Sequence, residues 1–167
     1  MDPGFAMDRD AVASVWVDSA RYLSDGGLPL GEQLVERVGR IAGVQSASFA
    51  NMLPLGTDVS ATRLRVDGAS VNTIGARTYV NSVAANYFAT LGIPFMRGRD
   101  FNDGDRHDGD RVVIISESVA KRMFPGMDAV NRRLMWTDPV TKFIGVSNDP
   151  RRIVGGGAGI HRGNPGA

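Results

Sequence analysis

The sequence VVIISESVAKRMFPG, residues 112–126, decides the fold. Its first four residues form a continuous apolar run, which is typical of a strand buried on both faces. Ser116 fits the N-cap of a following helix, and Glu117 is favourable at the positive end of that helix. Pro125 and Gly126 then end it. The residues expected on the inner face of this helix are Val119, Ala120, Met123 and Phe124.

This segment belongs to one of two strand-helix-strand units that the sequence predicts. Strands at 132–136 and 142–146 follow the helix and complete the unit. The other unit lies earlier in the chain, where a helix over 31–42 stands between strands at 11–17 and 44–50. The apolar residues that mark this earlier helix at helical spacing are Leu34, Val35, Val38, Ile41 and Ala42.

The residues between the two units are rich in β-structure signals. Alternating polar and apolar residues predict strands at 61–66 and 77–84. A short helix over 86–91, ended by Gly92, and an extended stretch over 93–97 follow. We therefore expect an α+β fold with a mixed β-sheet, in which two strand-helix-strand units of porter- or ferredoxin-like type enclose a β-rich middle.

The composition of the chain changes at Pro150. The last eighteen residues are rich in glycine, including the run 155–157, and offer little apolar surface. Such segments rarely bury enough surface to offset the entropy of ordering. We therefore expect a domain over residues 1–149, cut short at its C-terminal side, and a disordered tail over residues 150–167.

Length and charge limit the function classes. The 167 residues suffice for one domain with its own core, and the formal net charge is +1. The 17 arginines are spread along the sequence, so we expect no nucleic-acid partner. The chain contains 0 cysteines, which excludes a disulfide scaffold and thiol catalysis. It has no apolar run of about 18 residues and no signal-peptide pattern at its start, so we expect no direct membrane insertion.

The aspartate-rich loop over 100–110 is the strongest candidate for a metal site. Asp103, Asp105 and His107 have the alternating spacing of a hard-cation site. An EF-hand loop that began at Asp103 would need glycine at its sixth position and an acid at its twelfth. Those positions hold Asp108 and Ile114. We therefore expect a solvated turn and no metal site.

The patterns of common enzymes are also missing from the sequence. The glycine-rich end contains neither of the usual phosphate-binding glycine motifs. The only histidines are His107 and His161, and Ser116 lacks the GxSxG context of an exposed nucleophile. The prediction is a protein that is not an enzyme, with no cofactor and no catalytic residues.

Residues 81–101, NSVAANYFATLGIPFMRGRDF, carry a resemblance to a known family. They are similar to the signature YF-x-T-L-G-I-P-x-x-x-G-R-x-F of the MacB-type periplasmic core domain, the extracytoplasmic insert of FtsX-like ABC-transporter permeases. Residues 112–126 resemble the family segment V-V-I-S-E-x-x-A-x-x-x-F-P-G. The resemblance continues through 132–134 and 143–146. The family-motif residues, expected to be structural, are Tyr87, Phe88, Leu91, Gly92, Pro94, Gly98, Arg99, Phe101, Ser116, Glu117, Phe124, Gly126, Gly145 and Asp149.

Physical reasons for several of these residues exist without the family. Tyr87, Phe88 and Leu91 share one face of a short helix, and Asp100 could accept hydrogen bonds from backbone amides or from an arginine. Asn131 departs from the family, which usually has glycine there. Asparagine nevertheless tolerates positive φ better than most residues.

The resemblance implies a noncatalytic extracytoplasmic domain on the periplasmic side of the bacterial membrane, which couples motion of membrane helices to substrate or partner handling outside. Its implied partners are an ABC ATPase subunit and the membrane helices of the permease, with a homodimer as a further prediction. An alternative function is a stand-alone ligand- or peptide-binding protein that uses a groove between the β-rich middle and the strand-helix-strand units.

Overall fold

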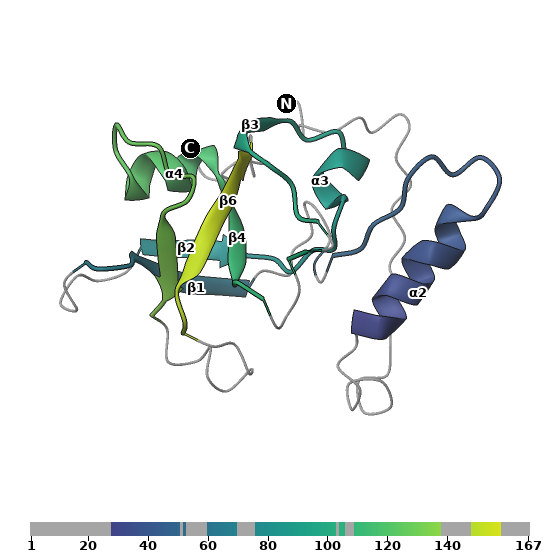
Figure 1. The fold of residues 1–167 in the computed structure, drawn as a ribbon, viewed down its shortest axis with the longest axis horizontal. Coiled ribbons are helices and arrows are strands. Elements are labelled where there is room, and N and C mark those ends of the chain that lie inside the picture. The colour runs from purple at the N-terminus through teal and green to yellow at the C-terminus, as the bar shows by residue number, and fades with distance from the viewer. Residues whose placement is uncertain are drawn as a thin grey trace, which may run out of the picture.

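The computed structural model describes residues 28–50, 52, 60–69, 76–102, 104–105, 109–137 and 148–157. These residues form three helices and six strands in the described part of the chain (Figure 1). In chain order the elements are α2 (Leu28–Gly39), β1 (Ser60–Val66), β2 (Ala76–Val80), α3 (Tyr87–Thr90), β3 (Phe95–Gly98), β4 (Val112–Ser116), α4 (Glu117–Met123), β5 (Arg133–Trp136) and β6 (Arg151–Gly157).

All six strands belong to one sheet, in the order β2-β1-β5-β6-β3, with β4 also paired to β6. The β4–β6 pair is parallel, and the other pairs are antiparallel. β5 pairs with the first residues of β6 and β3 with its last residues, while β4 pairs with β6 from Arg152 to Gly157. In Figure 1, β1 and β2 cross the direction of β6, so the sheet is curled. The predicted α+β class with a mixed sheet is confirmed.

The main core lies between α4 and one face of the sheet, which we call the inner face. Ser116 caps α4 as predicted, because its side chain accepts a hydrogen bond from the Val119 amide at 3.4 Å. Arg151 closes the edge of this core with its guanidinium 4.4 Å from the centroid of the Trp136 ring. The buried residues of the core are Leu64, Ile115, Val119, Phe124, Ala129, Leu134, Trp136 and Ile153.

A second, smaller cluster surrounds α3. Tyr87, Leu91 and Ile93 are buried there, and Phe88 packs against them. Burial raises the pKa of the Tyr87 hydroxyl, because a low-dielectric environment disfavours the phenolate. Gly92 leaves the helix with φ +64°, the left-handed conformation that the sequence predicts at this position.

The prediction of a disordered tail from residue 150 is wrong for residues 151–157. These residues form β6, which pairs with three other strands. Gly155 of β6 and Gly98 of the paired strand β3 are required because neighbouring backbone comes too close for a side chain. A Cβ atom on Gly155 would lie 2.3 Å from the Arg99 carbonyl oxygen, and one on Gly98 would lie 2.2 Å from the Val154 oxygen. Residues 158–167 lie outside the described residues.

The predicted strand at 44–50 is also wrong, because only Ala50 makes a β-bridge, to Val83. The rest of this segment is irregular, and side chains hold it against the chain around α3. The hydroxyls of Ser46 and Thr90 are 2.6 Å apart, and Ser48 donates to the Ala85 carbonyl. The predicted strands at 11–17 and 142–146 lie outside the described residues.

The predicted helix over 31–42 is present as α2, which begins and ends three residues earlier than expected. It stands apart from the sheet in Figure 1. Gly31 lies against the Phe49 ring, with no space for a Cβ atom between them. Leu34, Val38 and Ile41, which mark this helix by their apolar spacing in the sequence, are each at least 38% exposed.

Candidate functional site

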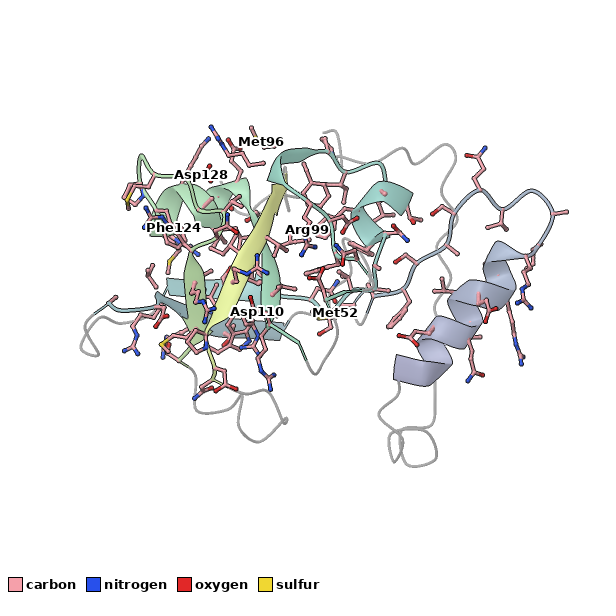
Figure 2. The ribbon with its side chains drawn as sticks, in the orientation of Figure 1. Met52, Met96, Arg99, Asp110, Phe124 and Asp128 are labelled. Atoms are coloured by element: carbon pink, nitrogen blue, oxygen red, sulfur yellow. The ribbon has the colours of Figure 1, made fainter. Side chains whose placement is uncertain are left out.

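A groove of about 350 Å³ lies between β3, α4 and the turn over residues 125–130. Met96, Asp128 and Phe124 all line this groove, and in Figure 2 Met96 and Asp128 are labelled above Phe124. The groove combines residues from both family-motif segments with residues of β6. Its lining residues are Met96, Arg97, Ile115, Glu117, Ala120, Lys121, Phe124, Gly126, Met127, Asp128, Ala129, Val130, Ile153 and Gly156.

The floor of the groove is apolar and belongs to the main core. Phe124 and Ile153 are 2% and 0% exposed, so this floor is fixed by packing on its far side. Two methionines flank it, with Met96 exposed by 61% and Met127 by 52%. Flexible, polarisable methionine side chains adapt to varied apolar partners. The groove can therefore hold an apolar group.

The turn that forms one wall has a well-defined backbone. Gly126 has φ +71°, and the Met127 amide donates to the Phe124 carbonyl at 3.1 Å. Asp128 accepts a hydrogen bond from the Val130 amide at 3.0 Å. Asn131 has φ +66°, which agrees with the expectation that it can replace the glycine of the family pattern.

Ion pairs surround the apolar floor. Arg97 lies 3.3 Å from the Asp128 carboxylate, and Lys121 lies 2.7 Å from Glu117, one helical turn away. Side chains of both signs thus stand on the rim. A ligand with an apolar body and a polar end of either sign could form charge-assisted hydrogen bonds there.

Arg99 shapes the turn that follows β3. Its guanidinium makes two hydrogen bonds to Asp105, at 2.6 and 2.8 Å, and a third to the Asp100 carbonyl. The hydrogen bond from Arg99 lowers the pKa of Asp105, and the same bond raises the pKa of Arg99. Asp100 accepts a hydrogen bond from the Phe101 amide at 2.7 Å, as the sequence predicts. In Figure 2, Arg99 lies between β6 and α3.

The structure divides the family-motif residues between several places. Glu117, Phe124 and Gly126 line the groove. The α3 cluster holds Tyr87, Phe88 and Leu91, with Gly92 and Pro94 in the segment between α3 and β3. Asp149 forms an ion pair with Arg111 at 3.4 Å. Gly145 lies outside the described residues. A structural role for the whole set stays a prediction.

Sequence reasoning missed several residues of the groove. Met96 and Arg97 lie inside the quoted motif, but its variable positions gave no reason to select them. Ile153 and Gly156 were assigned to the disordered tail. Met127 and Asp128 come directly after Pro125-Gly126, which predicts a turn at the end of the apolar helix. This turn is the one sequence signal that indicates residues lining a groove beside the helix.

The described residues contain no cluster of three or more His, Asp or Glu side chains arranged to hold a metal ion. Asp103 and His107 of the aspartate-rich loop lie outside those residues. Asp105 is engaged by Arg99, and its side chain is 8% exposed. In the same described ranges, the helices lack the length and apolar character needed to cross a bilayer.

The described residues thus form an α+β fold with a curled mixed sheet and a groove beside α4. The sequence matches the MacB-like periplasmic core domain family over residues 4–164. The chain belongs to this family. The match extends past residue 149, in agreement with the placement of β6 inside the sheet.

Two solved structures resemble the chain. The periplasmic region of MacB from Actinobacillus actinomycetemcomitans has 17% sequence identity and a TM-score of 0.51, with 78% of this chain and 51% of that chain covered. The extracellular domain of the noncanonic ABC-type transporter YknZ from Gram-positive bacteria has 16% identity and a TM-score of 0.52, with 77% and 57% covered. This chain therefore spans little more than half of either structure. A search of curated protein sequences found no match.

Proposed function

We propose that this chain is a noncatalytic domain of an ABC-transporter permease, which lies outside the cytoplasmic membrane and couples the motion of membrane helices to substrate or partner handling. The observation that carries the proposal is the family match over residues 4–164. The packing of α4 on the sheet supports it, because a sheet and helix with a shared core can move as one rigid body. ATP hydrolysis would belong to a separate ATPase subunit.

The location can be tested by cysteine labelling, because the chain contains 0 cysteines. Glu36→Cys places a single thiol on the polar face of α2, where the native side chain is 62% exposed. In intact cells that produce the protein from its own gene, a membrane-impermeant maleimide should label this cysteine. A cytoplasmic protein with an exposed cysteine serves as the control. Labelling of Glu36→Cys only after cell lysis would contradict the proposal.

The noncatalytic role has its own test. The purified chain should hydrolyse ATP no faster than a heat-denatured sample. Saturable hydrolysis that persists through repeated purification would contradict the assignment of ATP chemistry to a partner subunit.

A homodimer also belongs to this proposal, because β2 and β4 each pair with one strand in the described part of the chain. Light scattering at high concentration should detect it, and a strictly monomeric protein would count against it.

A second candidate function is binding of a ligand or peptide in the groove. The exposed Met96 and Met127 beside a buried apolar floor favour it. Ligands from a library of apolar peptides should raise the melting temperature of the chain, and Ala120→Leu should abolish the rise by filling the groove. A flat response to the library, or a rise that persists in Ala120→Leu, would contradict binding at this place.

A further inference from the structure

We call the face of the sheet that lies opposite the main core the outer face. This outer face carries a row of arginines. Side chains that are paired in register point to the same face of a sheet, and alternate residues along a strand share a face. Leu64, Leu134 and Trp136 occupy the inner face. The strand register therefore places one set of cations together on the outer face: Arg63, Arg65, Arg77, Arg133 and Arg152.

Two of these arginine pairs are directly opposed. Arg63 faces Arg77 across β1 and β2, and Arg133 faces Arg152 across β5 and β6. Like charges directly opposite each other in a sheet destabilise it. A fold that keeps such a pair without a compensating negative charge gives up stability there. This cost is expected where the face serves an interaction.

A carboxylate offsets the second pair. Asp110 lies 2.6 Å from Arg152 and 3.8 Å from Arg133. In Figure 2, Asp110 is labelled beside the lower end of β6. The hydrogen bond from Arg152 lowers the pKa of Asp110, as expected for a carboxylate held against cations. This end of the row is partly neutralised.

The other end of the row lacks such an offset within the described residues. Arg63 and Arg77 are exposed, and their side chains form no ion pair with any described carboxylate. The Nε atom of Arg65 is buried without a hydrogen-bond partner, and its Nη2 atom contacts the Met135 sulfur at 3.0 Å. Among the described residues, these three neighbouring guanidinium groups thus have no compensating anion.

We propose that the outer face of β2, β1, β5 and β6 docks an acidic segment of a partner protein. Guanidinium groups match carboxylates in a two-point geometry. Tyr79, which is 64% exposed, and Met135 stand among the arginines on the same face. Arginine, tyrosine and methionine are enriched in protein interfaces and lysine is depleted, a composition that favours a protein partner over a lipid surface.

The size of the partner segment follows from the sheet. Four neighbouring strands span about 14 Å from the first to the last. An extended peptide of about four or five residues covers that distance. The proposal stands on the charge pattern and the register, and it goes beyond the transport function without depending on it.

Binding can be measured with the purified 167-residue chain. The probe is a fluorescein-labelled decapeptide of alternating glutamate and aspartate, with a glutamine and asparagine decapeptide as its neutral counterpart. Fluorescence anisotropy should detect binding of the acidic peptide alone, weakening as salt is raised. The double substitution Arg63→Glu/Arg77→Glu should weaken binding by about tenfold or more, because it places like charges opposite the peptide.

A matched control separates this face from net charge. Arg37→Glu/Arg40→Glu makes the same charge change in the last turn of α2 and directly after Gly39, and it should alter peptide affinity by less than about twofold. Equal losses in the two double variants, or no binding of the acidic peptide, would overturn the proposal. Vesicles of phosphatidylglycerol and phosphatidylcholine form another arm. Vesicle binding that depends on Arg63 and Arg77 more strongly than peptide binding would assign the face to a membrane instead.

Stability supplies a second readout. Arg63→Thr keeps a residue suited to strands and removes one directly opposed pair. The melting temperature should rise by about 1 to 4 °C while peptide binding falls. If the melting temperature falls instead, Arg63 stabilises the sheet, and the argument for a stability cost at this face is refuted.

Discussion

The placement of Gly155 inside the sheet predicts that its replacement by alanine is strongly destabilising. A Cβ atom at this position would lie 2.3 Å from the Arg99 carbonyl oxygen and 3.0 Å from the Phe95 ring. The nearer contact is backbone that also bonds to β6, since the Arg99 amide donates to the Val154 carbonyl at 2.9 Å. The clash therefore requires β3 and β6 to separate locally.

The expected cost can be worked from this geometry. Overpacking a well-packed site costs about 1–3 kcal/mol, and a contact with backbone belongs at the upper end because the neighbour cannot rotate away. For a domain of this size each kcal/mol lowers the melting temperature by about 2–4 °C. Gly155→Ala should therefore lose about 3 kcal/mol of unfolding free energy, and its melting temperature should fall by roughly 6–12 °C.

The adjacent glycine is a matched control. A Cβ atom on Gly156 would meet the Ile115 oxygen at 3.9 Å, which is an ordinary contact. Gly156→Ala should therefore change the unfolding free energy by less than about 1 kcal/mol. Urea unfolding followed by circular dichroism measures both variants. If Gly155→Ala is as stable as Gly156→Ala, the close approach of β3 to β6 does not exist.

Further predictions concern the caps, the turns and the acidic loop. Ser116→Ala should destabilise the protein by about 1 kcal/mol in urea, because the Val119 amide loses its cap; an unchanged midpoint would contradict the cap. At Asn131, with φ +66°, Gly should be tolerated, whereas Val should cost about 1–2 kcal/mol by the same measurement; equal stabilities would refute the left-handed conformation. The hydrogen bond from Arg99 lowers the pKa of Asp105 in the folded state. The ionised Asp105 side chain therefore stabilises the folded protein above the unfolded-state pKa of about 3.9, and this stabilisation is lost as the pH falls through the lower, folded-state pKa. Asp105→Asn should therefore reduce stability at neutral pH and flatten its decline in acid, and a parallel decline with the native protein would contradict this. Phe124→Ala should cost about 3–5 kcal/mol, and a change below about 1 kcal/mol would contradict its place in the core.

Local patterns in the sequence are sufficient to predict the structural elements that are determined by residues close together in the chain. The strand and helix within residues 112–126 appear as β4 and α4, with Ser116 as the cap. The turn at Gly92 also follows from a local rule, because a left-handed residue ends the helix. Each of these features is decided within a few positions of the chain.

The strand β6 could not be predicted in this way. Residues 151–157 offer few apolar side chains in the sequence, since only Ile153 and Val154 in this stretch are aliphatic. These two side chains are 0% and 3% exposed. Gly155 beside them fits because the Phe95 ring and the Arg99 backbone lie against it. Such a close approach depends on residues more than fifty positions away in the sequence. The composition of residues 151–157 alone therefore cannot predict it.

The candidate surfaces could be anticipated only in part for the same reason. Glu117, Phe124 and Gly126 were selected from the motif, and they line the groove. The arginines of the outer face are dispersed along the sequence because they come from separate strands. The pairing of Arg63 with Arg77, and of Arg133 with Arg152, depends on strand register. A register shift of one residue would move these side chains to the other face.

Amide hydrogen exchange of β6 is the most direct test of the central claim that residues 151–157 complete the sheet of this family domain. The Ile153 amide donates to the Arg132 carbonyl at 2.8 Å, and the Arg152 amide donates to the Arg111 carbonyl at the same distance. We predict that the Ile153 amide exchanges only through global unfolding, as slowly as the amides of β4. Exchange of Ile153 at the rate of an unstructured peptide, with β4 still protected, would contradict the account.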